Sequence, residues 1–273
     1  MPGAPESEYV EARRVLLEVL EGLGPHREAI VVVGAQAIYL RIGEGTNEPD
    51  LAIAPYTIDA DLVLEPALTP DHPDLTTTLE ALGLVADDRQ PGVWWTSGGV
   101  EVDLMVPDLV AGPGRRGADL GAHGRTVARR ARGLEAALID NDALAVRSLD
   151  PSEPRAVTVR VAGCGALLVA KAHKIADRQD DERRSNDKDA LDVFRILRST
   201  STEAVASVIG QLLRDDLSAV VTNEAIEHLR TSFASPDSLG SRMAARAAEP
   251  LLDPDEVAAS IAVLTRDLLD AIE

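Results

Sequence analysis

The sequence of 273 residues has a single cysteine and no long apolar run. With only Cys164, the chain cannot form an internal disulfide, which fits a reducing compartment. Its apolar surroundings, VAGCGALL, predict a buried small side chain rather than a nucleophile. The apolar runs are too short to cross a membrane, and the first twenty residues lack the basic-then-apolar order of a signal peptide. We therefore expect a cytoplasmic protein without a membrane partner.

Lysine is also scarce. The three lysines, Lys171, Lys174 and Lys188, fall within eighteen residues of one another. An arginine-biased composition and chance would explain this, but phosphate sites also use such compact, mobile ammonium groups. The net charge of −19 argues against non-specific binding of nucleic acid by the whole surface. Positive charge is local: six arginines lie between Arg115 and Arg132, where the only acid is Asp119.

Several common site motifs are missing. The stretch VVVGAQA is a strand, a glycine and a helix start, but it lacks the G-x-G-x-x-G of dinucleotide sites. There is no P-loop motif and no G-x-S-x-G elbow, and the five histidines have no zinc-ligand spacing. These absences argue against a dinucleotide-dependent enzyme, a P-loop enzyme, an α/β-hydrolase and a zinc protein.

Hydrophobic periodicity predicts an α+β first half and a helical second half. We expect a domain boundary between residues 162 and 163. Strands are expected at 29–34, 56–66, 84–88, 92–96, 100–107, 143–149 and 156–163. Helices are expected at 8–23, 35–43, 69–83, 127–138, 165–178, 187–198, 203–214, 223–231, 239–250 and 254–272.

Two of the expected strands carry carboxylates at alternating positions. In YTIDADLVLEP, Thr57, Asp59 and Asp61 share one strand face, and in VEVDLMVP the same is true of Glu101 and Asp103. A solvated strand face is the commoner explanation for a lone D-x-D. With a second carboxylate strand, however, Asp59, Asp61 and Asp103 could converge on one sheet. Clustered carboxylates raise each other's pKa unless a cation lies between them, and hard oxygen ligands suit Mg²⁺.

The lysines lie downstream on two expected helices. Lys171, Lys174 and Arg178 are spaced i, i+3 and i+7, which places them on one helical face. A solvated, salt-bridged helix pair is the alternative explanation. The next helix presents three charged residues near its first turn: Lys188, Asp189 and Asp192.

Taken in order, VVVGAQAIYL, TIDADLVL, VEVDLM, AKAHKIADR and NDKDALDVFRIL resemble the polymerase-β-type nucleotidyltransferase superfamily. More narrowly, they are similar to the AbiEii/MenT group of toxin nucleotidyltransferases. Those proteins read Gly-Gly or Gly-Ser, then T-x-D-x-D, a helix lysine, and K-D-x-x-D. The resemblance covers residues 29–198. It implies a polymerase-β-like mixed sheet with helices as a catalytic domain over residues 1–162, and an α-helical domain over 163–273 that contributes phosphate-contacting residues.

The resemblance also implies roles for individual residues. The metal, Mg²⁺ or Mn²⁺, would be held by Asp59 and Asp61, with Asp103 as the third ligand or general base. The chain departs from the family at Gly34-Ala35, which replaces the usual pair, and in the longer stretch before Asp59. The expected nucleotide-binding residues are Gly34, Thr57, Lys171, Lys174 and Asp189.

The implied reaction moves a nucleoside monophosphate from an NTP to an acceptor hydroxyl and releases pyrophosphate. In the resembled group the acceptor is RNA, typically a tRNA 3′ end, and a cognate antitoxin is a partner. For RNA, we expect a basic track from Arg115 to Arg132, whose helical end would place Arg125, Arg129 and Arg132 on one face. Two alternatives stay open: a small-molecule transferase of the aminoglycoside-modifying kind, and a catalytically inactive relative that acts as a binding module.

Overall fold

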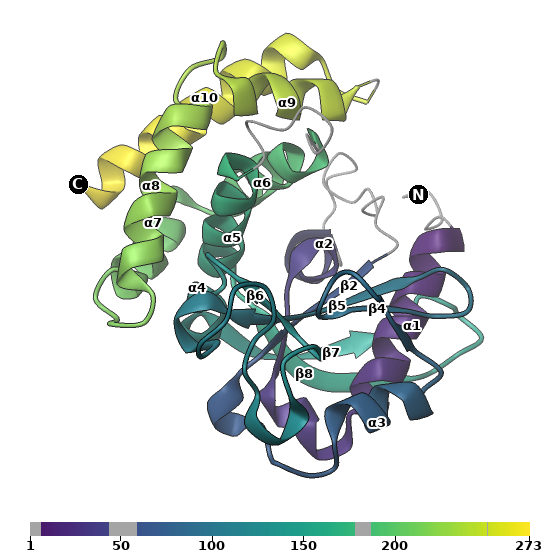
Figure 1. Ribbon diagram of the computed structural model, residues 1–273. Coiled ribbons are helices and arrows are strands. Elements are labelled where there is room, and N and C mark those ends of the chain that lie inside the picture. Colours follow the sequence, from purple (N-terminus) through teal and green to yellow (C-terminus); the bar gives the residue numbers. More distant parts are fainter. Residues whose placement is uncertain (1–6, 44–58, 178–186, 250) are drawn as a thin grey trace.

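The computed structural model describes residues 7–43, 59–177, 187–249 and 251–273. Its centre is an eight-stranded mixed sheet in the order β3-β4-β5-β2-β1-β8-β7, with β6 paired to β5 off this path (Figure 1). The strands are β1 (Ile30–Val32), β2 (Asp59–Leu64), β3 (Val85–Ala86), β4 (Val93–Trp95), β5 (Glu101–Pro107), β6 (Arg129–Ala131), β7 (Asn141–Arg147) and β8 (Ala156–Ala162). Each strand expected from the sequence is present.

The pairing in the middle of the sheet decides where the carboxylates lie. β2 pairs in parallel with β5 and antiparallel with β1, while β1 pairs in parallel with β8. β4 and β5 form an antiparallel hairpin. The two strands that carry carboxylates are therefore neighbours and run in the same direction.

The first helix, α1 (Ser7–Gly22), packs one apolar face against β2 and β8. The side chains expected on that face are all buried: Val15, Leu16, Val19, Leu20 and, just past the helix, Leu23. α2 (Gly34–Ile38) follows β1 directly and continues as one π-helical stretch to Gly43. α3 (Leu75–Ala81) packs against α1. α2 itself contacts the carboxylate strand β2.

From Gly163 onward the described residues contain helices and no strand, as expected. The helices are α5 (Cys164–Ala176), α6 (Asp187–Ser199), α7 (Thr202–Leu212), α8 (Ala219–Phe233), α9 (Leu239–Ala248) and α10 (Pro254–Ile272). They gather at one end of the molecule, and both α5 and α6 contact α2 (Figure 1). Within the described part of the chain, no helix is long and apolar enough to cross a membrane.

The helix expected near 127–138 is wrong. The structure has strand β6 at Arg129–Ala131, followed by the short helix α4 (Glu135–Ile139). β6 lies in parallel beside Met105–Pro107, so backbone hydrogen bonds to β5 outweigh the helical spacing of the arginines. Gly133, at φ +83°, then provides the left-handed turn that separates the strand from α4.

Candidate functional site

The carboxylates of β2 and β5 stand opposite one another in register. Asp59 is aligned with Glu101, and Asp61 with Asp103. Residues aligned across a parallel pair point to the same face, so the four side chains form a square on one side of the sheet. The alternate residues, such as Ala60 and Val102, point to the other side of the sheet and are buried there. The convergence of Asp59, Asp61 and Asp103 that the sequence predicts is present, and Glu101 joins it.

This crowding disfavours ionisation of two of the four groups. Burial, together with Asp103 and Asp59, raises the pKa of Asp61 to about 6, although Lys174 and Lys171 act in the opposite direction. Burial and the charges of Asp59, Asp103 and Asp61 likewise raise the pKa of Glu101 to about 7. A cation bound between these groups would relieve the repulsion.

Asp103 already has a counter-charge. Arg129 Nε lies 2.8 Å from Oδ1 and 3.0 Å from Oδ2 of Asp103, and Nη2 lies 2.5 Å from Oδ2. This forked contact joins β6 to β5 at a carboxylate that is only 6% exposed. A role for Asp103 as third metal ligand or general base stays a prediction, and it requires Arg129 to share or release one carboxylate oxygen.

Gly34 lies against Asp61. Its φ is +69°, and a Cβ atom at this position would be 1.9 Å from Asp61 Oδ2. The neighbouring Val33 N–H donates to the Asp61 carbonyl oxygen at 3.0 Å. Any side chain at position 34 would therefore displace the Asp61 carboxylate. Thr57, the other nucleotide contact expected on this side, lies outside the described residues.

A buried network of hydrogen bonds supports the start of β2. Gln36 Nε2 donates to the Asp59 carbonyl oxygen at 3.0 Å, and Arg13 Nε donates to Gln36 Oε1 at 3.0 Å. Arg13 is fully buried and also donates from Nη2 to the Tyr9 hydroxyl at 3.0 Å. Sequence reasoning missed this hydrogen-bond network, because the sequence of an amphipathic helix does not show that one of its arginines is buried.

The lysines of α5 face acids of α6 as an interior cluster. Lys171 Nζ lies 2.6 Å from Asp189 Oδ1 and 2.8 Å from Asp192 Oδ2, and all three side chains are at most 6% exposed. Lys174 Nζ lies 3.2 Å from the same Asp189 oxygen, but its side chain is 41% exposed. Arg195 Nη1 lies 3.3 Å from Asp192 Oδ1. The helix pair is salt-bridged, as the alternative explanation from the sequence expects, but Lys171 and its partners are buried rather than solvated.

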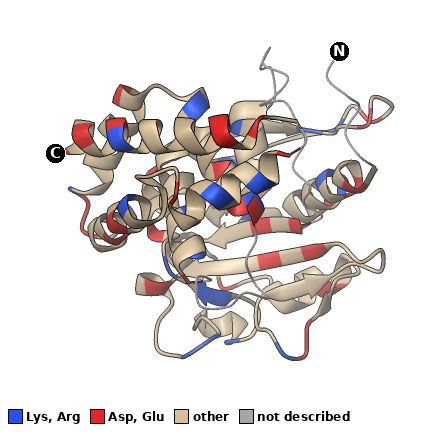
Figure 2. Cartoon of the chain, turned by 90° about the horizontal axis from the view of Figure 1, so that it is seen from above, with Lys and Arg blue, Asp and Glu red and all other residues tan. Residues whose placement is uncertain are grey.

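The lysine cluster and the sheet carboxylates belong to one electrostatic neighbourhood. Burial disfavours the Lys171 ammonium, but Asp192 and Asp189 outweigh this and raise its pKa. The same ammonium and that of Lys174 lower the pKa of Asp61. Figure 2 shows Lys and Arg on the helices and Asp and Glu on strands of the sheet. The sheet and the helical half thus contribute opposite charges to one site.

The arginines expected to bind the acceptor do not share a face. Arg125 Nη2 lies 2.6 Å from Asp119 Oδ2, and Arg132 Nη2 lies 2.6 Å from Glu224 Oε1 on α8. Arg129 is bound to Asp103. Each of the three therefore has its own carboxylate partner, and the expected helical track is absent.

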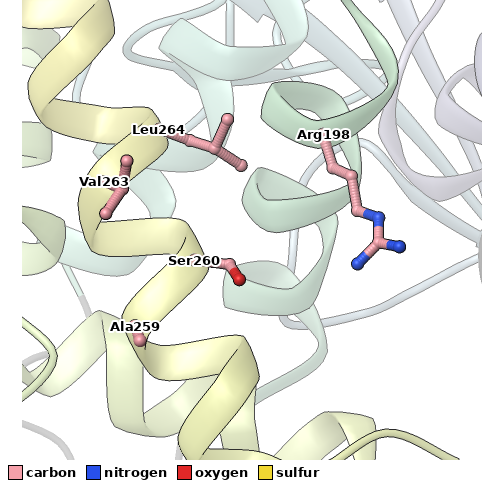
Figure 3. A pocket seen from close by; sticks show the side chains of 5 residues that line it. All are labelled: Arg198, Ala259, Ser260, Val263 and Leu264. Carbon is pink, nitrogen blue, oxygen red and sulfur yellow. The ribbon is translucent and has the colours of Figure 1, made fainter.

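A cavity of about 430 Å³ lies between α6 and α10 (Figure 3). Its lining is mostly apolar, and its charged member, Arg198, has its guanidinium carbon 5.7 Å from the centre of the Phe194 ring. The lining residues are Arg198, Ala259, Ser260, Val263 and Leu264. No carboxylate lines it, and no histidine or carboxylate in the lining could activate the Ser260 hydroxyl, so the carboxylate face of the sheet remains the candidate site.

The sequence predicts no role for two members of the site, Glu101 and Asp192. Glu101 nevertheless shares a strand face with Asp103, and Asp192 lies near Asp189. The available signal was the same in both cases: an acid at i−2 on a strand or at i+3 on a helix lies on the same face as its selected neighbour.

No family model matches the chain, and no curated protein is significantly similar to it. What the chain does is therefore inferred from its side chains and their geometry.

Proposed function

We propose that this protein is a metal-dependent nucleotidyltransferase that moves a nucleoside monophosphate from an NTP to an acceptor hydroxyl. The observation that carries the proposal is the alignment of Asp59 and Asp61 with Glu101 and Asp103 on two parallel strands. It is supported by Lys171 and Lys174, which bring positive charge to the same neighbourhood. A polymerase-β-like arrangement of the catalytic domain is part of this proposal.

The donor set fits a hard divalent cation. Among the described residues, no three His, Cys, Asp or Glu side chains already form a group that could enclose an ion. Mg²⁺, however, commonly needs only one or two protein carboxylates, with water and substrate phosphates as the other ligands. Asp59 and Asp61 would hold it, and the raised pKa of Asp61 indicates that a positive charge is favourable there. When bound, the ion would neutralise charge on the phosphate oxygens.

The chain's own residues would then share the remaining tasks. Gly34 leaves the Asp61 carboxylate room beside the backbone. Glu101, with a pKa of about 7, can exchange a proton near neutral pH and is a candidate to accept the proton of the acceptor hydroxyl. Asp103, held by Arg129, would keep the carboxylate row in register. The basic face of α5 would attract the triphosphate.

For the acceptor, the resemblance favours tRNA, and a cognate antitoxin would be the partner protein. One observation favours a second candidate, a small cationic acceptor of the aminoglycoside kind. Arg125, Arg129 and Arg132 are each neutralised by an acid, and the chain has a net charge of −19. An acidic surface attracts a cationic small molecule and repels a polyanion.

The test is incubation of the protein with each labelled NTP, Mg²⁺ and either total RNA or a panel of aminoglycosides. The matched control is the Asp59→Asn/Asp61→Asn variant. Label in tRNA supports the first acceptor, and label in the small molecules alone supports the second. If the wild-type protein binds NTP but transfers no label to either acceptor class, the inactive relative becomes the better explanation.

A further inference from the structure

The two lysines of α5 lie in different surroundings, although they are only one helical turn apart. Lys171 is 6% exposed at its side chain, whereas Lys174 is 41% exposed. Both ammonium groups contact Asp189, one from a buried side chain and the other from a partly exposed one. This contrast indicates that the two lysines have different tasks, although the resemblance implies that both bind the nucleotide.

Lys171 is held on two sides. Its ammonium has three N–H donors, and two of them are directed to Asp189 at 2.6 Å and Asp192 at 2.8 Å. If Lys171 moved toward a phosphate, the buried Asp189 and Asp192 would each lose their shortest charged contact and would keep the longer ones to Lys174 and Arg195, which is unfavourable. Lys171 is therefore needed between Asp189 and Asp192, where it balances their charge.

Lys174 has more freedom. Its 3.2 Å contact is to Asp189 Oδ1, an oxygen that already accepts the shorter bond from Lys171. Helix α5 contacts α2, and Gly34 at the start of α2 lies against Asp61. Lys174 is thus the exposed and less tightly held ammonium on the helix that adjoins the carboxylate site.

We propose that Lys174 contacts the triphosphate of the bound nucleotide, while Lys171 has a structural role and holds Asp189 and Asp192 between α5 and α6. The inference rests on the proposed nucleotidyltransferase function. It differs from the assignment that the resemblance implies, in which Lys171 and Lys174 both bind the nucleotide.

The test compares the affinity of four variants for each of the four NTPs with Mg²⁺, measured by calorimetry. Lys174→Ala should raise the dissociation constant about tenfold or more, because a charged hydrogen bond is lost, and should leave the melting temperature close to that of the wild type. Lys174→Arg should restore part of the affinity. Lys188→Ala, an exposed residue at the start of α6, is the matched control and should bind like the wild type.

Lys171→Met, which keeps the length of the apolar stem, should instead lower the melting temperature or prevent folding. Either result supports the structural role. A folded Lys171→Met variant that has lost nucleotide affinity, with Lys174→Ala binding normally, would overturn the assignment and leave the proposed function intact. A wild-type protein that binds none of the four nucleotides would overturn both.

Discussion

Replacing Asp61 by asparagine should make the protein more stable while abolishing transfer. The pKa of Asp61 is raised from 3.8 to about 6, because burial and the neighbouring carboxylates disfavour its charged form. The folded state therefore binds this proton more tightly than the unfolded chain does. The cost of ionising Asp61 begins as the pH rises above 3.8 and reaches its full value above pH 6.

The size of the effect follows from that difference in pKa. At about 1.4 kcal/mol per pH unit, the full cost of the Asp61 charge is about 3 kcal/mol at pH 8. At pH 5 it is about 1.6 kcal/mol, because the folded carboxyl is then mostly protonated. Asp61→Asn keeps the shape of the side chain without the charge, so its gain in unfolding free energy should grow from pH 5 to pH 8.

Urea denaturation of both proteins at pH 5, 6.5 and 8 measures this gain. Asp119→Asn is the control, and it should lower the unfolding free energy instead of raising it. A hydrogen bond from Arg125 lowers the pKa of Asp119, so the charged form of this carboxylate favours the folded state. Mg²⁺ should also raise the melting temperature of the wild type at pH 8, but not that of Asp61→Asn. A variant that is less stable than the wild type at pH 8, or whose gain does not change with pH, would refute the reasoning.

Three further substitutions test contacts of the site by the same urea assay. Gly34→Ala should cost at least about 1–2 kcal/mol from the left-handed backbone alone, with a further loss as Asp61 is displaced; wild-type stability would mean that the close approach is not real. Arg129→Ala should cost about 3 kcal/mol, because Asp103 is left buried without its counter-charge. Arg132→Ala removes an exposed pair and should cost less than about 1 kcal/mol, and equal losses from both arginines would contradict this assignment.

The carboxylate face could be predicted from the sequence because strand alternation is a local property. Side chains two residues apart on a strand share a face whatever the strand pairs with, so Asp59 lies with Asp61, and Glu101 with Asp103. The same local logic placed Lys171 and Lys174 on one side of α5. Strand and helix positions followed from apolar periodicity, and the structure has each expected strand.

The arginine segment could not be predicted in this way. Its spacing fits a helix, but residues 129–131 form a strand because they pair with Met105–Pro107, the end of β5 that extends past its pairing with β4. The partner of Arg129 is Asp103, 26 residues earlier in the chain. A helical pattern contains no information about such a distant partner.

The sequence by itself thus determined which side chains share a face, since that depends only on backbone geometry over a few residues. Only the tertiary structure decided which faces meet. The alignment of Asp61 with Asp103 depends on the register of two strands separated by more than thirty residues of chain. The different burial of Lys171 and Lys174 depends on how α6 packs against α5. Burial and opposing charge act through space, so their effects on these groups appear only once the chain has folded.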